Sequence, residues 1–74
     1  MSKYMGFKNW NQWNVSLWIN NDERLYRLCL DEIKRHGSKK AAAKYLAGSV
    51  FYGRKTPDGA TFSHTSIRRA MVGM

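Results

Sequence analysis

Cysteine and proline are nearly absent from this chain of 74 residues, which contains one of each, Cys29 and Pro57. A single thiol cannot form an internal disulfide, and with two histidines far apart in the sequence it does not provide the usual ligand set of a zinc site. We therefore expect no metal ion and no cofactor. Cys29 is interpreted as a small buried residue on a helix.

Long apolar runs are absent as well. None approaches the roughly 20 residues that a membrane-spanning helix needs, and the N-terminus lacks the basic-then-apolar layout of a secretory signal. The sequence predicts a soluble protein with no membrane partner, in the cytoplasm, or in the host cell cytoplasm if the chain is viral. Because so short a chain buries only about 60% of its unfolded surface, we expect one domain over residues 1–74 with a helical, aromatic-rich core.

Acidic residues are scarce, since 5 Asp and Glu stand against 13 Lys and Arg. Basic and acidic side chains cancel over residues 1–32, so the net charge of +8 lies entirely in residues 33–74, where Asp58 is the only acid. A one-sided positive field is what a polyphosphate partner selects through counterion release. We favour a nucleic-acid partner over the alternative, a solvated basic face that only aids solubility.

Helical spacing of apolar residues dominates the first half of the chain, where Trp13 and Leu17 lie four residues apart, as do Leu25 and Cys29. The sequence predicts a mainly α fold: a compact four-helix, helix-turn-helix-like domain with a small β-hairpin inserted before the last helix. The expected segments are an arm over 1–8, helices over 9–21, 22–36, 38–47 and 63–72, and a hairpin flap over 49–62. The residues expected to dominate the core are Trp13, Leu17, Leu25, Leu28, Cys29, Ile33, Leu46, Ile67 and Met71.

The hairpin is predicted from two short β-prone stretches around a turn. Residues 50–52 and 60–62 are rich in aromatic and β-branched side chains, and residues 56–59 contain a Pro-Asp-Gly turn signal. If Phe51, Tyr52 and Phe62 were exposed on such a flap, they could stack unpaired RNA bases, although burial against the helices is the more ordinary outcome.

A helix-turn-helix pattern follows in the second half of the chain. Its support helix would use Gly37, Ser38, Ala42, Ala43 and Leu46, and its recognition helix Ser63, Ser66, Ile67, Arg69 and Met71. Small alanines allow two helices to cross closely, a serine caps the second helix, and arginines project outward, so the chain resembles helix-turn-helix proteins. It departs from them because the usual turn has only about three or four residues, whereas a long insertion separates Leu46 from Ser63.

The resemblance implies duplex DNA as the partner and a regulatory role. The residues expected to read base edges are His64, Thr65, Ser66, Arg68 and Arg69, and those expected to hold phosphate are Lys39, Lys40, Lys44, Arg54 and Lys55. The alternative for residues 63–72 is a capped amphipathic helix that only closes the core. Proteins of this kind often dimerise, but the sequence separates no dimer-forming stripe from the core, so the oligomeric state stays open.

A second resemblance covers residues 4–23. The matching residues are Tyr4, Gly6, Asn9, Trp13, Val15, Leu17, Trp18 and Asn21, followed by Asp22 and Glu23. This pattern resembles the opening signature of small uncharacterised proteins of bacteriophages, plasmids and haloarchaeal viruses. It implies a mobile-element origin, but no activity comes with it. The alternative function, which small size, a single compact domain and this signature fit equally well, is a virus-encoded inhibitor that binds a host defence complex, of anti-CRISPR or antirestriction type, with Tyr4, Phe7 and Trp10 as an aromatic anchor.

Catalytic constellations find little support in the sequence. Asp31 and Glu32 are neighbours and point about 100° apart on a helix, so they do not form an acid–base pair. Ser63 and His64 lie close together, but no carboxylate near them in the sequence would orient the imidazole. We therefore expect a protein that is not an enzyme.

Overall fold

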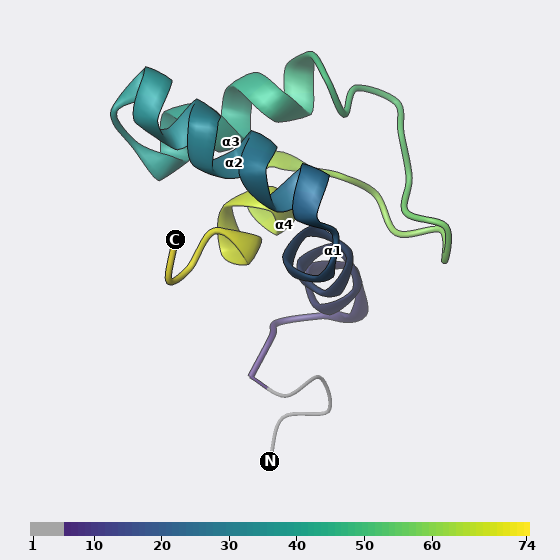
Figure 1. The fold of residues 1–74 in the computed structure, drawn as a ribbon. Helices are drawn as coiled ribbons and strands as arrows, with labels where there is room; N and C mark the ends of the chain where they lie inside the picture. The colour runs from purple at the N-terminus through teal and green to yellow at the C-terminus, as the bar shows by residue number, and fades with distance from the viewer. Residues whose placement is uncertain (1–5) are drawn as a thin grey trace.

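The computed structural model describes residues 6–74, and within them four helices follow one another along the chain (Figure 1). They are α1 (Trp10–Asn21), α2 (Glu23–His36), α3 (Lys39–Gly48) and α4 (His64–Ala70). The helices contact one another in a ring, α1 with α2, α2 with α3, α3 with α4 and α4 with α1. The predicted mainly α class is confirmed, and no helix within the described residues has the length and apolar character needed to cross a membrane.

Local signals set where these helices begin and end. The carboxylate of Asp22 accepts a hydrogen bond from the backbone N–H of Arg24 at 2.9 Å, and Ser38 Oγ accepts one from the N–H of Ala41 at 3.0 Å. Gly37, with φ of +76°, ends α2 in the left-handed conformation that glycine adopts without steric cost. Because these polar and glycine caps are explicit in the sequence, the first three helices begin and end within about one residue of their predicted bounds.

The core gathers residues from all four helices and from the segment between α3 and α4. Its buried apolar members are Val15, Ile19, Cys29, Ala42, Ala43, Leu46, Phe51, Ala60, Phe62, Ile67, Ala70 and Met71. Four residues expected in the core, Cys29, Leu46, Ile67 and Met71, are fully buried, and Leu25, Leu28 and Ile33 pack against the core while only partly buried. Alanines at 42 and 43 let α3 lie close to its neighbours.

The predicted core face of α1 is wrong. Val15 and Ile19 are fully buried, whereas Leu17 is 41% exposed and Trp13 is only partly buried. The helix carries apolar residues on opposite sides, so periodicity alone did not distinguish the inner face from the outer one. The outer side instead carries Trp10 and Leu17, which are 38% and 41% exposed.

The predicted hairpin is also wrong, because residues 6–74 contain no β-strand. Between α3 and α4 the chain makes one isolated antiparallel bridge, between Lys55 and Thr61. The rings of Phe51 and Phe62 stack on each other in the core, with centroids 4.4 Å apart and planes 11° apart. Their β-prone side chains therefore serve packing rather than strand pairing, and among the three residues considered for RNA stacking only Tyr52, at 77% exposure, remains open to a base.

A polar network that is buried at Asn14 and Thr56 and reaches the surface at Asp58 ties this segment to α1. Thr56 Oγ1 donates to Asn14 Oδ1 at 2.6 Å, and the Asn14 amide donates to Asp58 Oδ2 at 2.9 Å. The indole N–H of Trp18 donates to the same oxygen at 2.9 Å. Both hydrogen bonds lower the pKa of Asp58 because they stabilise its charged form, and the bond from Asn14 has the larger effect. Figure 1 shows the consequence: the segment swings out from α3 and returns along α1 to reach α4.

The predicted arm is described only in part. Residues 1–5, including Tyr4 of the opening signature, lie outside the described residues, and residues 6–8 lead into α1 without regular structure. The helix then begins after Asn9, whose side chain accepts a hydrogen bond from the N–H of Gln12 at 2.9 Å.

Candidate nucleic-acid interface

Helix α4 owes its position to reciprocal serine caps. Ser63 Oγ accepts from the N–H of Ser66 at 3.2 Å, and Ser66 Oγ accepts from the N–H of Ser63 at 3.0 Å. Ser66 is fully buried and its hydroxyl also lies 3.1 Å from the carbonyl oxygen of Thr61. Ser66 therefore fixes the start of α4 and, contrary to its predicted role, does not reach a ligand at the surface.

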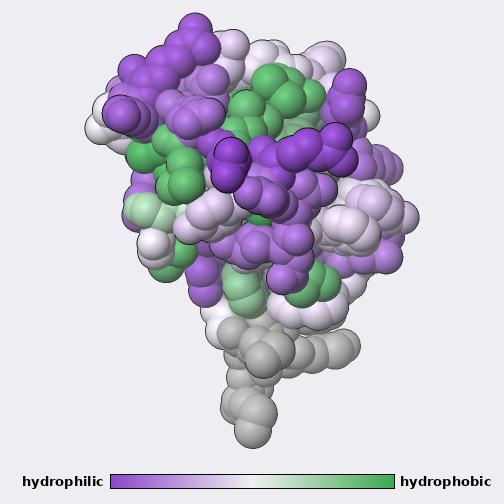
Figure 2. All heavy atoms as spheres, in the orientation of Figure 1, coloured by the Kyte–Doolittle hydropathy of each residue, from purple (hydrophilic) through white to green (hydrophobic). Residues whose placement is uncertain are grey.

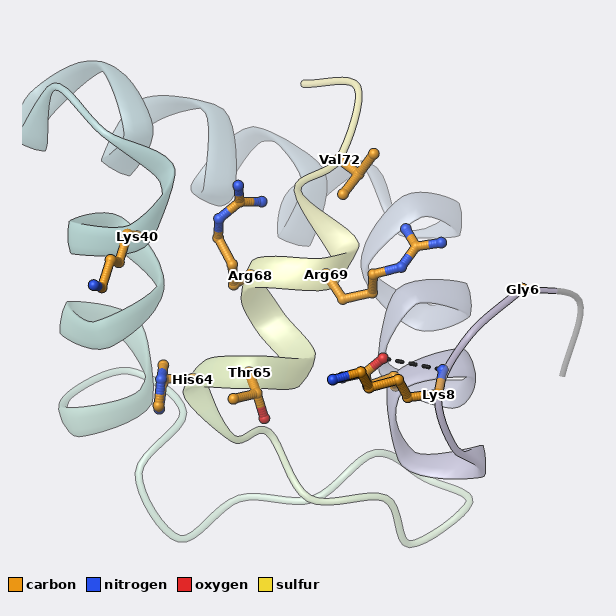
Figure 3. Close-up of a pocket in the computed structure, with 9 residues that line it drawn as sticks. Gly6, Lys8, Lys40, His64, Thr65, Arg68, Arg69 and Val72 are labelled. Atoms are coloured by element: carbon orange, nitrogen blue, oxygen red, sulfur yellow. Dashed lines mark hydrogen bonds between the residues drawn. The ribbon is translucent and has the colours of Figure 1, made fainter.

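The exposed side of α4 forms the floor of a groove of about 500 Å³, which we name the basic groove. Its lining residues come from the N-terminal segment, α1, α3 and α4, and are Gly6, Lys8, Gln12, Lys40, His64, Thr65, Arg68, Arg69 and Val72. Figure 3 shows Arg68 and Arg69 on α4, with Lys40 on one side and Lys8 on the other. Four cationic side chains from three separate parts of the chain thus border one depression.

One of these cations is held by an aromatic ring. The guanidinium carbon of Arg69 lies 4.2 Å from the centroid of the Phe7 ring, within the range of a cation–π interaction. The backbone N–H of Lys8 donates to Gln12 Oε1 at 3.3 Å, the bond drawn in Figure 3. Together these contacts hold residues 7 and 8 beside α4 and α1. Residues 7 and 8 thereby form the wall of the groove opposite α3.

No carboxylate lines the basic groove, and the ion pairs of the described residues lie on α2. Glu23 pairs with Arg27 at 2.9 Å, as their spacing predicts. Glu32, rather than its neighbour Asp31, pairs with Arg35 at 3.3 Å. Within residues 6–74 neither arginine of α4 has a carboxylate partner, so the positive charge of the groove is not neutralised at short range.

A carboxylate–histidine pair also occurs on α2. His36 Nε2 lies 3.0 Å from Glu32 Oε2, and the His36 ring packs against Tyr45 of α3 with centroids 4.9 Å apart. Glu32 is only 8% exposed, so this contact supplies a partner to a buried carboxylate and joins α2 to α3. His36 therefore has a structural role in joining α2 to α3.

The structure brings together five of the ten residues proposed from the sequence. Lys40, His64, Thr65, Arg68 and Arg69 line the basic groove. The others do not line it: Ser66 is buried, and Lys39, Lys44, Arg54 and Lys55 lie elsewhere, on α3 and on the segment after it.

Two groove residues, Lys8 and Gln12, were missed in the sequence. Lys8 belongs to the half of the chain whose charges cancel, and it is separated from Arg68 by some 60 positions. Only the contact of α1 with α4 places it at the groove. The sequence offers one hint of this role, the aromatic residue Phe7 beside Lys8 just before a helix. That hint does not indicate which later segment of the chain Phe7 contacts.

Comparison with models of protein families identifies the family of this chain. The model of a family of unknown function, DUF7249, covers residues 1–74, and the chain belongs to this family. No curated protein and no solved structure matches the chain.

Proposed function

We propose that this member of a family without an assigned function binds duplex DNA through the basic groove. The observation that carries the proposal is the convergence of Lys8, Lys40, Arg68 and Arg69 on one depression that no carboxylate lines. The distances along the chain between these residues mean that the fold, rather than a local run of basic sequence, gathers them.

The chemistry of the groove suits a phosphate backbone. Lysine and arginine that neutralise phosphates release condensed counterions, which supplies most of the sequence-independent affinity for DNA. The guanidinium of Arg68 can donate two parallel hydrogen bonds to one phosphate, while Lys40 acts as a point charge across the groove. The stack on Phe7 restricts the Arg69 guanidinium, so less conformational entropy is lost when it binds.

Side chains next to these cations can contact base edges. His64 and Thr65 occupy the exposed first turn of α4, one turn before Arg68. With seven residues α4 is about 10 Å long, and the major groove of B-DNA is about 12 Å wide, which admits a helix. The regulatory role expected from the sequence requires discrimination among duplexes, and selection of bound sites from a random duplex pool measures it.

The proposal is tested by fluorescence anisotropy of a labelled duplex over a salt series from roughly 50 to 200 mM. Arg68→Ala is the informative variant, because Arg69 also holds Phe7 and its loss would disturb the groove wall. Removal of one phosphate contact should weaken binding and lower the slope of log K against log salt by about 0.9. Lys8→Ala should act in the same direction.

Arg24→Ala is the matched control, since Arg24 is an exposed arginine of α2 outside the groove. It removes the same charge and should leave the salt slope unchanged. Absence of binding by the wild-type protein at about 50 mM salt would exclude the proposal. Equal losses in the Arg24 and Arg68 variants would show that binding follows net charge rather than the groove.

A further inference from the structure

The outer face of α1 is apolar and uncharged. Trp10, Trp13, Leu17 and Asn21 lie at intervals of three and four and so share one stripe on the side of the helix away from Val15. Trp10 and Leu17 are 38% and 41% exposed. No residue from Trp10 to Asn21 is charged, although the whole chain carries a net charge of +8.

A hollow of about 290 Å³ lies beside this stripe. It is lined by Phe7, Trp13, Ser16, Leu17, Asn20 and Asn21. The end of the hollow toward the C-terminus of α1 is bordered by the asparagines, whose amides donate to backbone carbonyls: Asn21 Nδ2 to Leu17 O at 2.8 Å, and Asn20 Nδ2 to Ala70 O at 3.2 Å. One N–H of the Asn21 amide is thus engaged, and the side-chain oxygen Asn21 Oδ1 is left to accept a hydrogen bond.

Charge decides which partner suits this face. An acidic protein or a nucleic acid would be attracted to the cations elsewhere on the molecule rather than to an uncharged helix. Two copies of this chain repel each other wherever their basic surfaces meet, and they can approach with least repulsion through a face that carries no charge. The face therefore fits a second copy of the chain.

The geometry of the stripe is self-complementary about a two-fold axis. Trp13 and Leu17 lie on either side of the middle of α1, so antiparallel pairing of two helices sets Trp13 of one copy against Leu17 of the other. The same pairing brings Trp10 to the asparagine end of the hollow in the second copy. The Trp10 indole N–H has no acceptor among residues 6–74, and the free Asn21 carbonyl oxygen of the second copy can accept it.

We propose that the outer face of α1 is an isologous interface through which two copies of this chain form an antiparallel dimer. The inference does not depend on DNA binding. A helix of 12 residues is about 18 Å long and offers less than the roughly 800 Å² per partner of a standard stable interface. The dimer should therefore be weak, with a dissociation constant above about 1 µM.

Sedimentation equilibrium of the full chain over a concentration series tests the interface. The wild-type protein should shift from monomer to dimer, and Leu17→Lys should remain monomeric because it places a cation at the centre of the interface. Leu30→Lys is the matched control: Leu30 is 38% exposed on α2, and the variant carries the same added charge. It should dimerise like the wild type.

Circular dichroism of both variants establishes that each is folded. A wild-type protein that stays monomeric at about 1 mM overturns the inference. So does a Leu17→Lys variant that is folded and still dimerises, since the association then uses another face. Equal loss of dimer in both lysine variants would likewise overturn it, because added charge alone would account for the effect.

Discussion

Asn14→Ala is expected to destabilise the fold through a buried hydroxyl. Asn14 is 1% exposed and Thr56 is 4% exposed, and the bond between them is 2.6 Å long. The alanine variant leaves Thr56 Oγ1 without an acceptor for its proton, although this oxygen still accepts from the N–H of Ala60 at 2.9 Å. A buried polar group left unsatisfied costs about 1 to 3 kcal/mol, which for a domain of this size lowers Tm by about 4 to 8 °C for each kcal/mol.

Urea denaturation followed by far-ultraviolet circular dichroism measures this cost, and the midpoint should fall while the slope stays constant. Asn21→Ala, measured at a protein concentration low enough for the chain to be monomeric, is the control because its exposed amide bonds only to its own helix. The difference between the variants therefore reports the lost network. In a Thr56→Val background Asn14→Ala should cost less, by about 0.5 kcal/mol or more. Equal stabilities for Asn14→Ala and Asn21→Ala would refute the reasoning.

Three further predictions concern pH, backbone conformation and thiol reactivity. The lowered pKa of Asp58 means that its ionised form stabilises the fold above the ordinary value of about 3.9 and that this contribution is lost as pH falls through the lower folded-state pKa. In Asp58→Asn the urea midpoint should therefore depend less on pH below about 3.9 than it does in the wild type. Gly37→Ala should lower the free energy of unfolding by about 1 kcal/mol because φ at Gly37 is +76°. Gly48 lies in α3 with no atom within 4 Å of an added Cβ, so Gly48→Ala should raise the free energy of unfolding by up to about 1 kcal/mol in the same urea assay. Burial raises the pKa of Cys29 to about 11, so only about one thiol in a thousand is ionised at pH 8, and Ellman's reagent should react rapidly only once urea unfolds the chain; rapid reaction in native buffer would contradict this.

The helices were predictable because their boundaries are determined by neighbouring residues. Asp22 and Ser38 cap at short range, and Gly37 supplies a left-handed conformation, so each signal acts within a few positions of the helix that it bounds. The inner face of α1 was not predictable in this way. Val15 and Leu17 are both apolar, and which of them is buried depends on where α4 contacts the helix, a long-range property.

The conformation of the segment after α3 was not predictable for a related reason. Phe51 and Phe62 have high β propensity, yet each finds its main partner in the other's ring rather than across a strand ladder. Asn14, which holds the segment through Thr56 and Asp58, reads in sequence as an ordinary polar residue of a helix. The turn at 56–59 was correctly expected, since the N–H of Gly59 donates to Thr56 O at 2.8 Å.

The candidate site was predictable where its residues share one helix. His64, Thr65, Arg68 and Arg69 follow from the capped pattern around Ser63, because the exposed face of a short helix is set by its own periodicity. The base-reading role predicted for Ser66 was wrong. A serine at this position can either face outward or complete the helix cap, and in the structure Ser66 is buried and completes the cap.

The positions of the carboxylates explain how this small chain can be stable and still carry a strongly positive groove. Asp22 caps α2, Glu23 and Glu32 pair with cations of α2, and Asp58 accepts from α1. Four of the five acids are therefore engaged at positions away from the basic groove, and the fifth, Asp31 of α2, does not line it. It follows that Lys8, Lys40 and Arg68 contribute little to folding, so substitutions there should change ligand affinity at nearly constant stability. Loss of the Asp22 cap or of the buried Glu32 should instead weaken the fold without altering the lining of the groove.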